Sequence, residues 1–138
     1  MPRQNDTALL RKAAAAAMNA YAPYSSFRVG AAVLTRGGKV FTGCNVENAS
    51  YGLTLCAERV ALTGAVAAGH REFAKLAVVA GQEKAAIPCG ACLQVLAEFC
   101  GPEMPVLLAP LNAPTRPLCL KLKDLLPKAF RLTRTDER

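Results

Sequence analysis

Four residues in two short stretches have the side chains best suited to chemistry. Cys56 and Glu58 lie two positions apart, and Cys89 and Cys92 follow within the run Pro88-Cys89-Gly90-Ala91-Cys92. Thiolates bind zinc tetrahedrally, and a catalytic zinc site leaves one of the four positions open to water. Three cysteines with a carboxylate beside the first therefore indicate an open site, in which the carboxylate can shuttle protons of the metal-activated water.

A closed structural zinc site is the alternative interpretation. Cys44 could supply a fourth thiolate, and four thiolates complete a tetrahedron that needs no carboxylate. That arrangement leaves Glu58 and the loop 45–48 without a role, so the sequence favours the catalytic site. The variant Cys44→Ser separates the two interpretations, because only the structural site would lose its zinc.

The predicted helices place both groups of thiols at helix starts. A loop over 45–55 leads into a helix predicted over 55–68, and Pro88 precedes a second helix that extends towards Gly101. The partial positive charge at a helix N-terminus favours thiolate over thiol. Cys89 and Cys92, three positions apart, share one face of the first turn. The two helix starts can therefore meet around one metal ion.

The rest of the chain alternates helices with apolar strands. Asp6 or Thr7 can cap a helix that runs to about Ala20, and its many alanines favour that helix. Gly37-Gly38 predicts a hairpin turn. Strands are predicted over 27–35, 39–44, 75–80, 105–109 and 116–121, with a short final helix over 122–126. This alternation predicts an α/β fold, a three-layer α/β/α sandwich with a mixed five-stranded sheet.

The composition is that of one globular domain spanning residues 1–138, with flexible ends at about 1–5 and 133–138. No apolar run approaches the ~20 residues that cross a bilayer. The first residues also lack the apolar core of a secretory signal. We therefore expect a soluble cytoplasmic enzyme, whose six cysteines bind metal or are buried rather than form three disulfides.

The formal net charge of +7 does not by itself indicate a nucleic-acid partner. Binding to phosphates uses clustered Lys and Arg, whereas the basic residues here are scattered and no basic run is interleaved with aromatics. A mild excess near the C-terminus comprises Lys121, Lys123, Lys128, Arg131, Arg134 and Arg138. We expect neither a nucleic acid nor a membrane as a partner.

Five motifs, in their order and spacing, resemble the small homotetrameric cytidine deaminases. They are Tyr21-Ala22-Pro23-Tyr24-Ser25-x-Phe27, Gly43-Cys44-Asn45-Val46-Glu47-Asn48, Cys56-Ala57-Glu58-Arg59, Pro88-Cys89-Gly90-Ala91-Cys92-x-Gln94 and Leu125-Leu126-Pro127-x-x-Phe130. The resemblance covers residues 6–130 and implies the same fold. It implies a homotetramer with one zinc ion per subunit, held by Cys56, Cys89 and Cys92. It also implies hydrolytic deamination of cytidine and deoxycytidine in pyrimidine salvage.

The resemblance implies roles for further residues. Glu58 would take a proton from water, give it to N3 of the pyrimidine and then help to protonate the departing amino group. Phe27 would stack on the base. Asn45 and Glu47, two positions apart and so on one face of an extended segment, would hold the 3′ hydroxyl of the sugar.

Tyr51 and Phe130 would, by the same resemblance, reach into the site of a neighbouring subunit. Arg59 would hydrogen-bond ligand sulfurs and so offset the net negative charge of three thiolates on Zn²⁺. Two positions depart from the family pattern: Leu93 stands where an arginine often follows the second cysteine, and Ile87 where a serine commonly precedes Pro-Cys. The first departure places more of the tuning of the metal on Arg59.

Two other activities compete with cytidine deamination. A deaminase of a modified cytosine nucleoside, such as a nucleoside antibiotic, would have the same fold. A polynucleotide-editing deaminase fits less well, because Asn45-x-Glu47 suits a free sugar with nothing attached at that hydroxyl.

Overall fold

The computed structural model describes residues 3–132 of the chain. Its elements, in chain order, are α1 (Gln4–Ala17), β1 (Val29–Thr35), β2 (Val40–Cys44), the short 3-10 helix η1 (Tyr51–Leu53), α2 (Ala57–Ala67), β3 (Phe73–Ala80), α3 (Gly90–Phe99), β4 (Pro105–Ala109), β5 (Leu118–Lys121) and α4 (Leu122–Leu125). The predicted ends 1–2 and 133–138 lie outside the described residues, whereas Gln4 and Asn5 belong to α1 rather than to a loose end.

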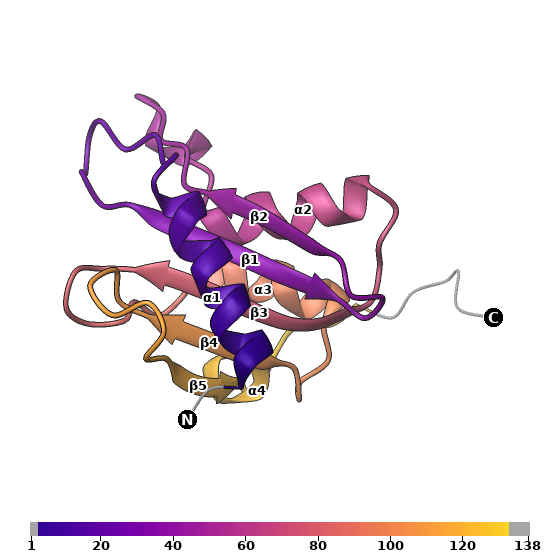
Figure 1. Cartoon of the computed structure of the whole chain (residues 1–138). Helices are drawn as coiled ribbons and strands as arrows, with labels where there is room; N and C mark the ends of the chain where they lie inside the picture. Colours follow the sequence, from indigo (N-terminus) through magenta and orange to yellow (C-terminus); the bar gives the residue numbers. More distant parts are fainter. Residues whose placement is uncertain (1–2, 133–138) are drawn as a thin grey trace.

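The five strands form one mixed sheet in the order β2-β1-β3-β4-β5, with helices on both faces (Figure 1). β1 pairs antiparallel with β2 and β3, β3 runs parallel to β4, and β4 pairs antiparallel with β5. Parallel neighbours require a crossover connection, and α3 supplies it on the face that α2 also covers. The predicted mixed five-stranded sheet and the α/β/α layering are confirmed.

α1 covers the opposite face and packs through small side chains. Leu10 and Ala13 are fully buried there together with Ala32 and Ala77 of the sheet. A Cβ added at Gly30 of β1 would lie only 1.9 Å from the carbonyl oxygen of Ala13. The alanines of α1 therefore allow a close approach to the sheet, in addition to favouring the helix itself.

α2 also packs closely against β2. A Cβ at Gly43 would lie 2.6 Å from the backbone nitrogen of Ala61 and 2.7 Å from the carbonyl oxygen of Ala57. Leu62 and Leu96, from α2 and α3, are buried in one cluster on this face of the sheet. This packing fixes the starts of both helices relative to the sheet.

Some predicted boundaries of α1 are wrong. The helix begins at Gln4, with Arg3 at the N-cap position, rather than after a cap at Asp6 or Thr7. Asp6 is 7% exposed and its carboxylate pairs with the ammonium group of Lys75 on β3, so it anchors the helix to the sheet instead of capping it. The helix ends at Ala17, three residues early, in a series of turns.

Tertiary contacts also shift other element starts. β1 begins at Val29 rather than at Phe27, because the N–H of Phe27 donates to the Ser25 hydroxyl instead of to a neighbouring strand. α2 begins at Ala57 because Leu55 bridges to the loop before it. Shifts of one or two residues also affect the bounds of further elements: β2 is Val40–Cys44, β3 is Phe73–Ala80, α3 is Gly90–Phe99, β5 is Leu118–Lys121 and α4 is Leu122–Leu125.

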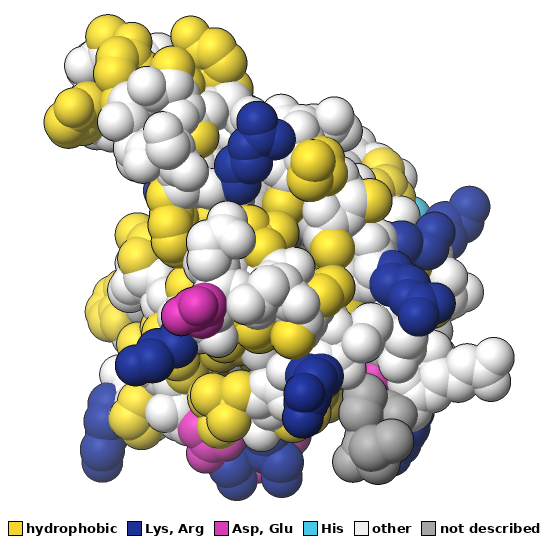
Figure 2. Space-filling model, turned by 60° about the vertical axis from the view of Figure 1, so that its left-hand side comes forward, with side chains coloured by type: hydrophobic (Ala, Val, Ile, Leu, Met, Phe, Trp, Pro, Cys, Tyr) yellow, Lys and Arg dark blue, Asp and Glu magenta, His cyan; other side chains and the backbone are white. Residues whose placement is uncertain are grey.

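Large apolar side chains gather on a lobe at the top of the molecule, whereas Lys and Arg are spread over the rest of that face (Figure 2). Two connections project at the top in Figure 1, the loop between α1 and β1 and the loop between β2 and α2. We call them the upper loops, 18–28 and 45–55. Their exposed large apolar residues are Met18, Tyr21, Tyr24, Phe27, Val46, Tyr51, Leu53 and Leu55.

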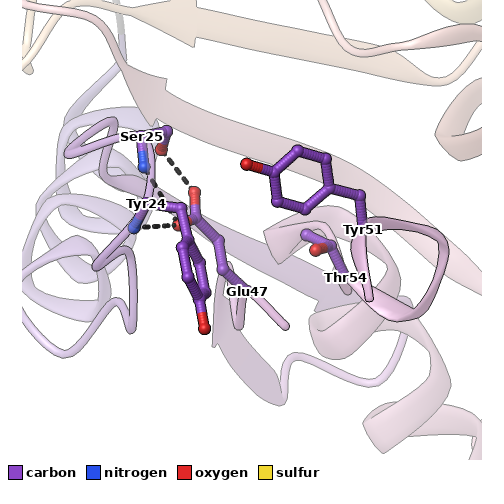
Figure 3. Close-up of a pocket in the computed structure, with 5 residues that line it drawn as sticks. All are labelled: Tyr24, Ser25, Glu47, Tyr51 and Thr54. Carbon is purple, nitrogen blue, oxygen red and sulfur yellow. Dashed lines mark hydrogen bonds between the residues drawn. The ribbon is translucent and has the colours of Figure 1, made fainter. Parts of the chain in front are cut away.

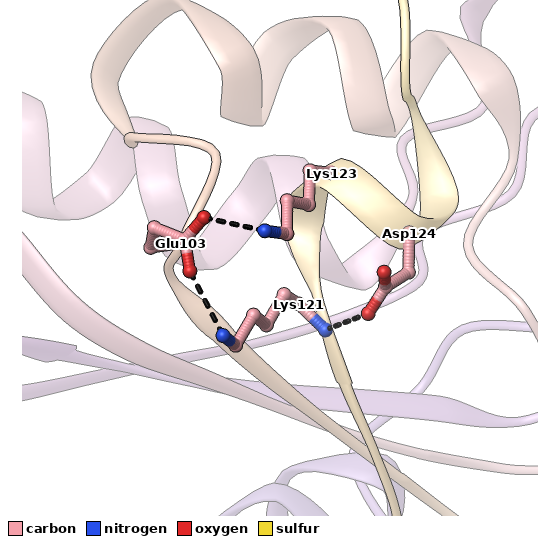
Figure 4. Close-up of polar contacts among 4 residues, drawn as sticks. All are labelled: Glu103, Lys121, Lys123 and Asp124. Carbon is pink, nitrogen blue, oxygen red and sulfur yellow. Dashed lines mark hydrogen bonds and ion pairs between the residues drawn. The ribbon is translucent and has the colours of Figure 1, made fainter.

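Part of the basic excess near the C-terminus is neutralised within the chain. Glu103 forms ion pairs with Lys121 at 2.9 Å and with Lys123 at 2.7 Å (Figure 4). The two lysines lower the pKa of Glu103 to about 2, and the hydrogen bond from Lys121 is the largest cause. The two lysines are thus already paired with a carboxylate. None of the helices that the structure describes is long and apolar enough to cross a membrane.

Candidate functional site

The three cysteines predicted to bind a metal lie together. The Sγ atoms of Cys56 and Cys89 are 4.0 Å apart and those of Cys89 and Cys92 are 3.4 Å apart. All three sulfurs lie within 4.8 Å of one another. Sulfurs on a tetrahedral zinc ion, each at about 2.3 Å from the metal, are about 3.8 Å apart. The cluster therefore fits one zinc ion.

Two of these cysteines occupy the predicted helix starts. Cys56 is the N-cap residue of α2 and Cys89 that of α3, and neither side chain caps its own helix. Their carbonyl groups accept the first hydrogen bonds of the helices, from the N–H groups of Val60 at 3.1 Å and Leu93 at 3.0 Å. The thiols are left for another partner, at an end of the helix that favours the thiolate form.

Cys44 does not join them. Among the residues that the structure describes, the group of close potential ligands at this place comprises Cys56, Cys89 and Cys92. Cys44 ends β2 and offers no sulfur within that distance. The alternative of a closed site with four thiolates is therefore not favoured, because the described cluster offers three thiols.

A cavity of about 280 Å³ opens beside the sulfurs. Six of the predicted site residues line it together: Phe27, Asn45, Glu47, Cys56, Glu58 and Cys89. Val78 and Ala80 at the end of β3 also line the cavity. Ile87, which is 55% exposed, adds an apolar side chain to the lining. Residues from both upper loops and from both helix starts thus share one cavity.

Glu58 lies in the first turn of α2 and is only 5% exposed. Burial raises the pKa of this carboxyl group, because desolvation disfavours its charged form, although its own backbone N–H and the nearby Arg59 act in the other direction. A carboxyl group with a raised pKa exchanges protons more readily near neutral pH. Glu58 has the burial and position that a proton shuttle requires.

Arg59 supplies positive charge to the sulfurs. Its Nη2 donates to Cys56 Sγ at 3.2 Å, and this hydrogen bond is the largest cause of the raised pKa of the guanidinium group. Its Nε is buried without a hydrogen-bond partner. Leu93, one of the two positions that depart from the expected pattern, is 5% exposed and packs into the core. Burial also raises the pKa of the Cys92 thiol, so a thiolate there needs a cation beside it.

The two polar residues at the sugar end of the predicted site differ in their surroundings. Asn45 is 7% exposed, and its amide donates to the Phe27 carbonyl at 2.8 Å and accepts from the N–H of Val29 at 2.9 Å. Asn45 therefore also fixes the backbone that carries Phe27. Glu47 is half-buried, and residues of the other upper loop donate to its carboxylate.

A second cavity, of about 350 Å³, shares part of its lining with the first (Figure 3). Glu47, Ser25 and Thr54 line both cavities. Tyr24 and Tyr51 form its aromatic walls, with ring centroids 6.1 Å apart. The sequence interpretation gave no role to Ser25 or Thr54. The sequence feature that could have pointed to Ser25 is its hydroxyl group two positions before Phe27.

Tyr51 and Phe130 do not line the cavity beside the sulfurs in their own chain. Tyr51 is 74% exposed and lines only the second cavity, and Phe130 is 67% exposed and lines neither. The carbonyl of Phe130 accepts a hydrogen bond from Gln94 of α3 at 2.8 Å. The structure thus places Phe130 beside α3, on the surface.

Comparisons with known proteins agree with this geometry. Residues 3–108 match the family model described as the cytidine and deoxycytidylate deaminase zinc-binding region. The chain is 48% identical over 122 residues to a cytidine deaminase of Sporosarcina psychrophila, covering 88% of each chain. It is 46% identical over 132 residues to that of Mycobacterium tuberculosis H37Rv, covering 96% of this chain and 94% of the relative.

Among solved structures, the chain resembles the cytidine deaminase of Burkholderia pseudomallei with a TM-score of 0.85 and 50% sequence identity. The match covers 94% of this chain and all of that one (100%).

Proposed function

The chain belongs to the cytidine deaminase family, and from this membership we propose how its residues divide the work of the reaction. The reaction is the zinc-dependent hydrolysis of the 4-amino group of cytidine, in which water adds, ammonia leaves and uridine results. Deoxycytidine yields deoxyuridine in the same way. The observation that carries the proposal is a cluster of three thiols, two of which, Cys56 and Cys89, line the cavity that Glu58 also lines.

Cys56, Cys89 and Cys92 hold the zinc ion. When bound, zinc supplies a Lewis acid that lowers the pKa of a coordinated water to about 7. Arg59 stabilises the thiolates, because its guanidinium group donates to Cys56 Sγ. With Leu93 in the core, Arg59 is the cation that the structure brings to these sulfurs.

Glu58 moves the protons. Its carboxylate accepts a proton from the water that adds to C4 and gives it to N3 of the pyrimidine. It then takes the proton of the hydroxyl group now at C4 and passes it to the departing amino group, so that ammonia and the C4 carbonyl result. Burial favours this task, because the raised pKa of Glu58 brings its protonated and ionised forms closer in free energy near neutral pH.

Phe27, Asn45 and Glu47 hold the nucleoside. Phe27 is half exposed at the cavity wall and offers a ring face to the base. Glu47 accepts a hydrogen bond from the 3′ hydroxyl of the sugar, and Asn45 has one amide hydrogen left to contribute after its bond to Phe27. A polynucleotide has a phosphate at that sugar position, so this arrangement favours free nucleosides.

The active form is a homotetramer in which the upper loops are covered by other subunits. Several apolar side chains are exposed there, and an apolar patch of this kind is typical of an interface. Tyr51 and Phe130 project from the surface of one subunit and complete the site of a neighbour. Light scattering on the purified protein measures the mass of the assembly, and a monomer that turns over cytidine normally would contradict this part of the proposal.

The whole chain acts as one catalytic domain in the cytoplasm. All six cysteines are free thiols, including the exposed Cys119, which suits a reducing compartment.

One assay tests the activity itself. Purified enzyme is incubated separately with cytidine, deoxycytidine, a modified cytosine nucleoside and a single-stranded oligodeoxycytidine, and released ammonia is measured. We expect turnover of the first two and none of the oligonucleotide. Preferential turnover of the modified nucleoside or of the oligonucleotide would reassign the substrate.

A further inference from the structure

Glu47 is held by one turn of the loop between α1 and β1. Its Oε1 accepts hydrogen bonds from the backbone N–H groups of Tyr24, at 2.9 Å, and Ser25, at 3.2 Å, and its Oε2 accepts one from the Ser25 hydroxyl. Figure 3 shows the carboxylate facing these donors, with Tyr51 and Thr54 across the second cavity. Ser25 thus supplies two of the three donors.

The Ser25 hydroxyl has a second partner. It accepts a hydrogen bond from the N–H of Phe27 at 3.0 Å. The same turn contains Ser26, whose φ of 59° lies in the left-handed region, and the N–H of Ser26 closes the turn on the Ala22 carbonyl at 3.0 Å. One hydroxyl therefore links the carboxylate at the sugar end of the cavity to the backbone of the aromatic ring at its base end.

The described residues give Glu47 no other strong partner. It forms no ion pair, and neither cavity that it borders is lined by a lysine or arginine. The titratable groups that line these cavities with it are Tyr24, Tyr51, Cys56, Glu58 and Cys89. The hydrogen bond from Ser25 is the largest cause of the lowered pKa of Glu47.

We propose that Ser25 is a positioning residue for sugar recognition, which fixes the orientation of the Glu47 carboxylate so that its free lone pairs meet the 3′ hydroxyl of the nucleoside. This inference rests on the proposed function, because it assumes that Glu47 binds that hydroxyl. Without the Ser25 hydroxyl, Glu47 keeps only two backbone donors, both on Oε1, and the carboxylate can rotate away from the sugar.

The test compares Ser25→Ala, Ser25→Thr and the control Ser26→Ala on cytidine and on 3′-deoxycytidine. Ser26 lies next in the chain, and its hydroxyl forms none of the bonds to Glu47. We expect Ser25→Ala to raise KM for cytidine about tenfold, the loss of one hydrogen bond to a charged group. We expect kcat to change less than about twofold. On 3′-deoxycytidine the KM of Ser25→Ala should equal that of the wild type.

Ser25→Thr retains a hydroxyl and should restore the KM for cytidine, and Ser26→Ala should leave it unchanged. An equal loss on both substrates, or a loss that Thr does not rescue, would overturn the proposal in favour of a general structural role. Wild-type enzyme that releases no ammonia from cytidine would instead contradict the proposed function.

Carbon-13 NMR of the Glu47 carboxyl group, assigned with Glu47→Gln, tests the contact without substrate. In Ser25→Ala its pKa should rise towards the ordinary glutamate value of about 4.3. An unchanged pKa would overturn the proposal even if the kinetic constants changed.

Discussion

The metal side and the sugar side of the cavity are built differently. On the metal side, Cys92 and Glu58 are buried, and the starts of α2 and α3 are fixed by core packing. On the sugar side, Glu47 is half-buried and Tyr51 is exposed, and hydrogen bonds between the two upper loops hold the site together. The first side belongs to the core of one chain, whereas the second is assembled on its surface.

We therefore expect substitutions on the two sides to have different effects. A change on the metal side alters the metal content or the chemical step, because every group there depends on the helix starts. A change on the sugar side alters how tightly the nucleoside is held, because the thiols and Glu58 stay in place. The substitutions below test this separation, beginning with the largest expected effect.

Cys92→Ser should abolish both zinc binding and activity. Cys92 is completely buried with its sulfur 3.4 Å from that of Cys89, and a serine hydroxyl is a poor substitute for a thiolate on zinc. Metal analysis and ammonia release measure the two losses. Cys44→Ser is the matched control and should keep one zinc ion per subunit. Loss of zinc from the control would revive the closed structural site.

Glu58→Gln should keep its zinc and lose about 10²–10⁴ in kcat, the usual contribution of a general acid–base group. The amide has the same shape as the carboxyl group but cannot carry the proton. Steady-state kinetics together with metal analysis check the result. A near-normal kcat would remove Glu58 from the reaction, and a variant free of zinc would show that Glu58 is needed to hold the metal.

Gly43→Ala should lower the free energy of unfolding by about 1–3 kcal/mol, because the new methyl group overpacks the contact between β2 and α2. Gly64→Ala in the same helix is the control, since a Cβ there meets nothing within 4 Å. It should be neutral or stabilise by up to about 1 kcal/mol. Denaturant unfolding of both variants measures the difference. Equal stability would mean that α2 is not fixed by this contact.

Phe27→Leu should have the smallest effect, on KM alone. Leucine keeps the apolar wall but loses aromatic stacking worth about 0.5–1.5 kcal/mol, which corresponds to a rise in KM of roughly two- to twelvefold. The zinc content and kcat should stay at wild-type values. A fall in kcat with loss of zinc would break the separation between the two sides, since Phe27 lies on the sugar side.

Sequence reasoning was most successful where local rules act alone. The spacing of the cysteines and their predicted positions at helix starts indicated that Cys56, Cys89 and Cys92 lie together. Apolar runs bounded by turn residues predicted the strands of the sheet. The errors occur where a distant partner decides. Asp6 has the side chain of a helix cap, but Lys75, far along the chain, pairs with its carboxylate.

The sugar side was harder to predict for the same reason. Ser25 was visible in a motif, yet its partner Glu47 lies 22 positions away and the two meet only when the upper loops pair. Phe27 was predicted to begin a strand, but Asn45 and Ser25 hold its backbone outside the sheet. These contacts between loops leave no periodic trace in the sequence.

X-ray absorption at the zinc edge of the purified wild-type enzyme tests the central claim most directly. The account predicts one zinc ion per subunit with three sulfur ligands at about 2.3 Å and one lighter oxygen or nitrogen ligand. Four sulfur ligands would contradict it, because the protein would then fill the position that the reaction requires.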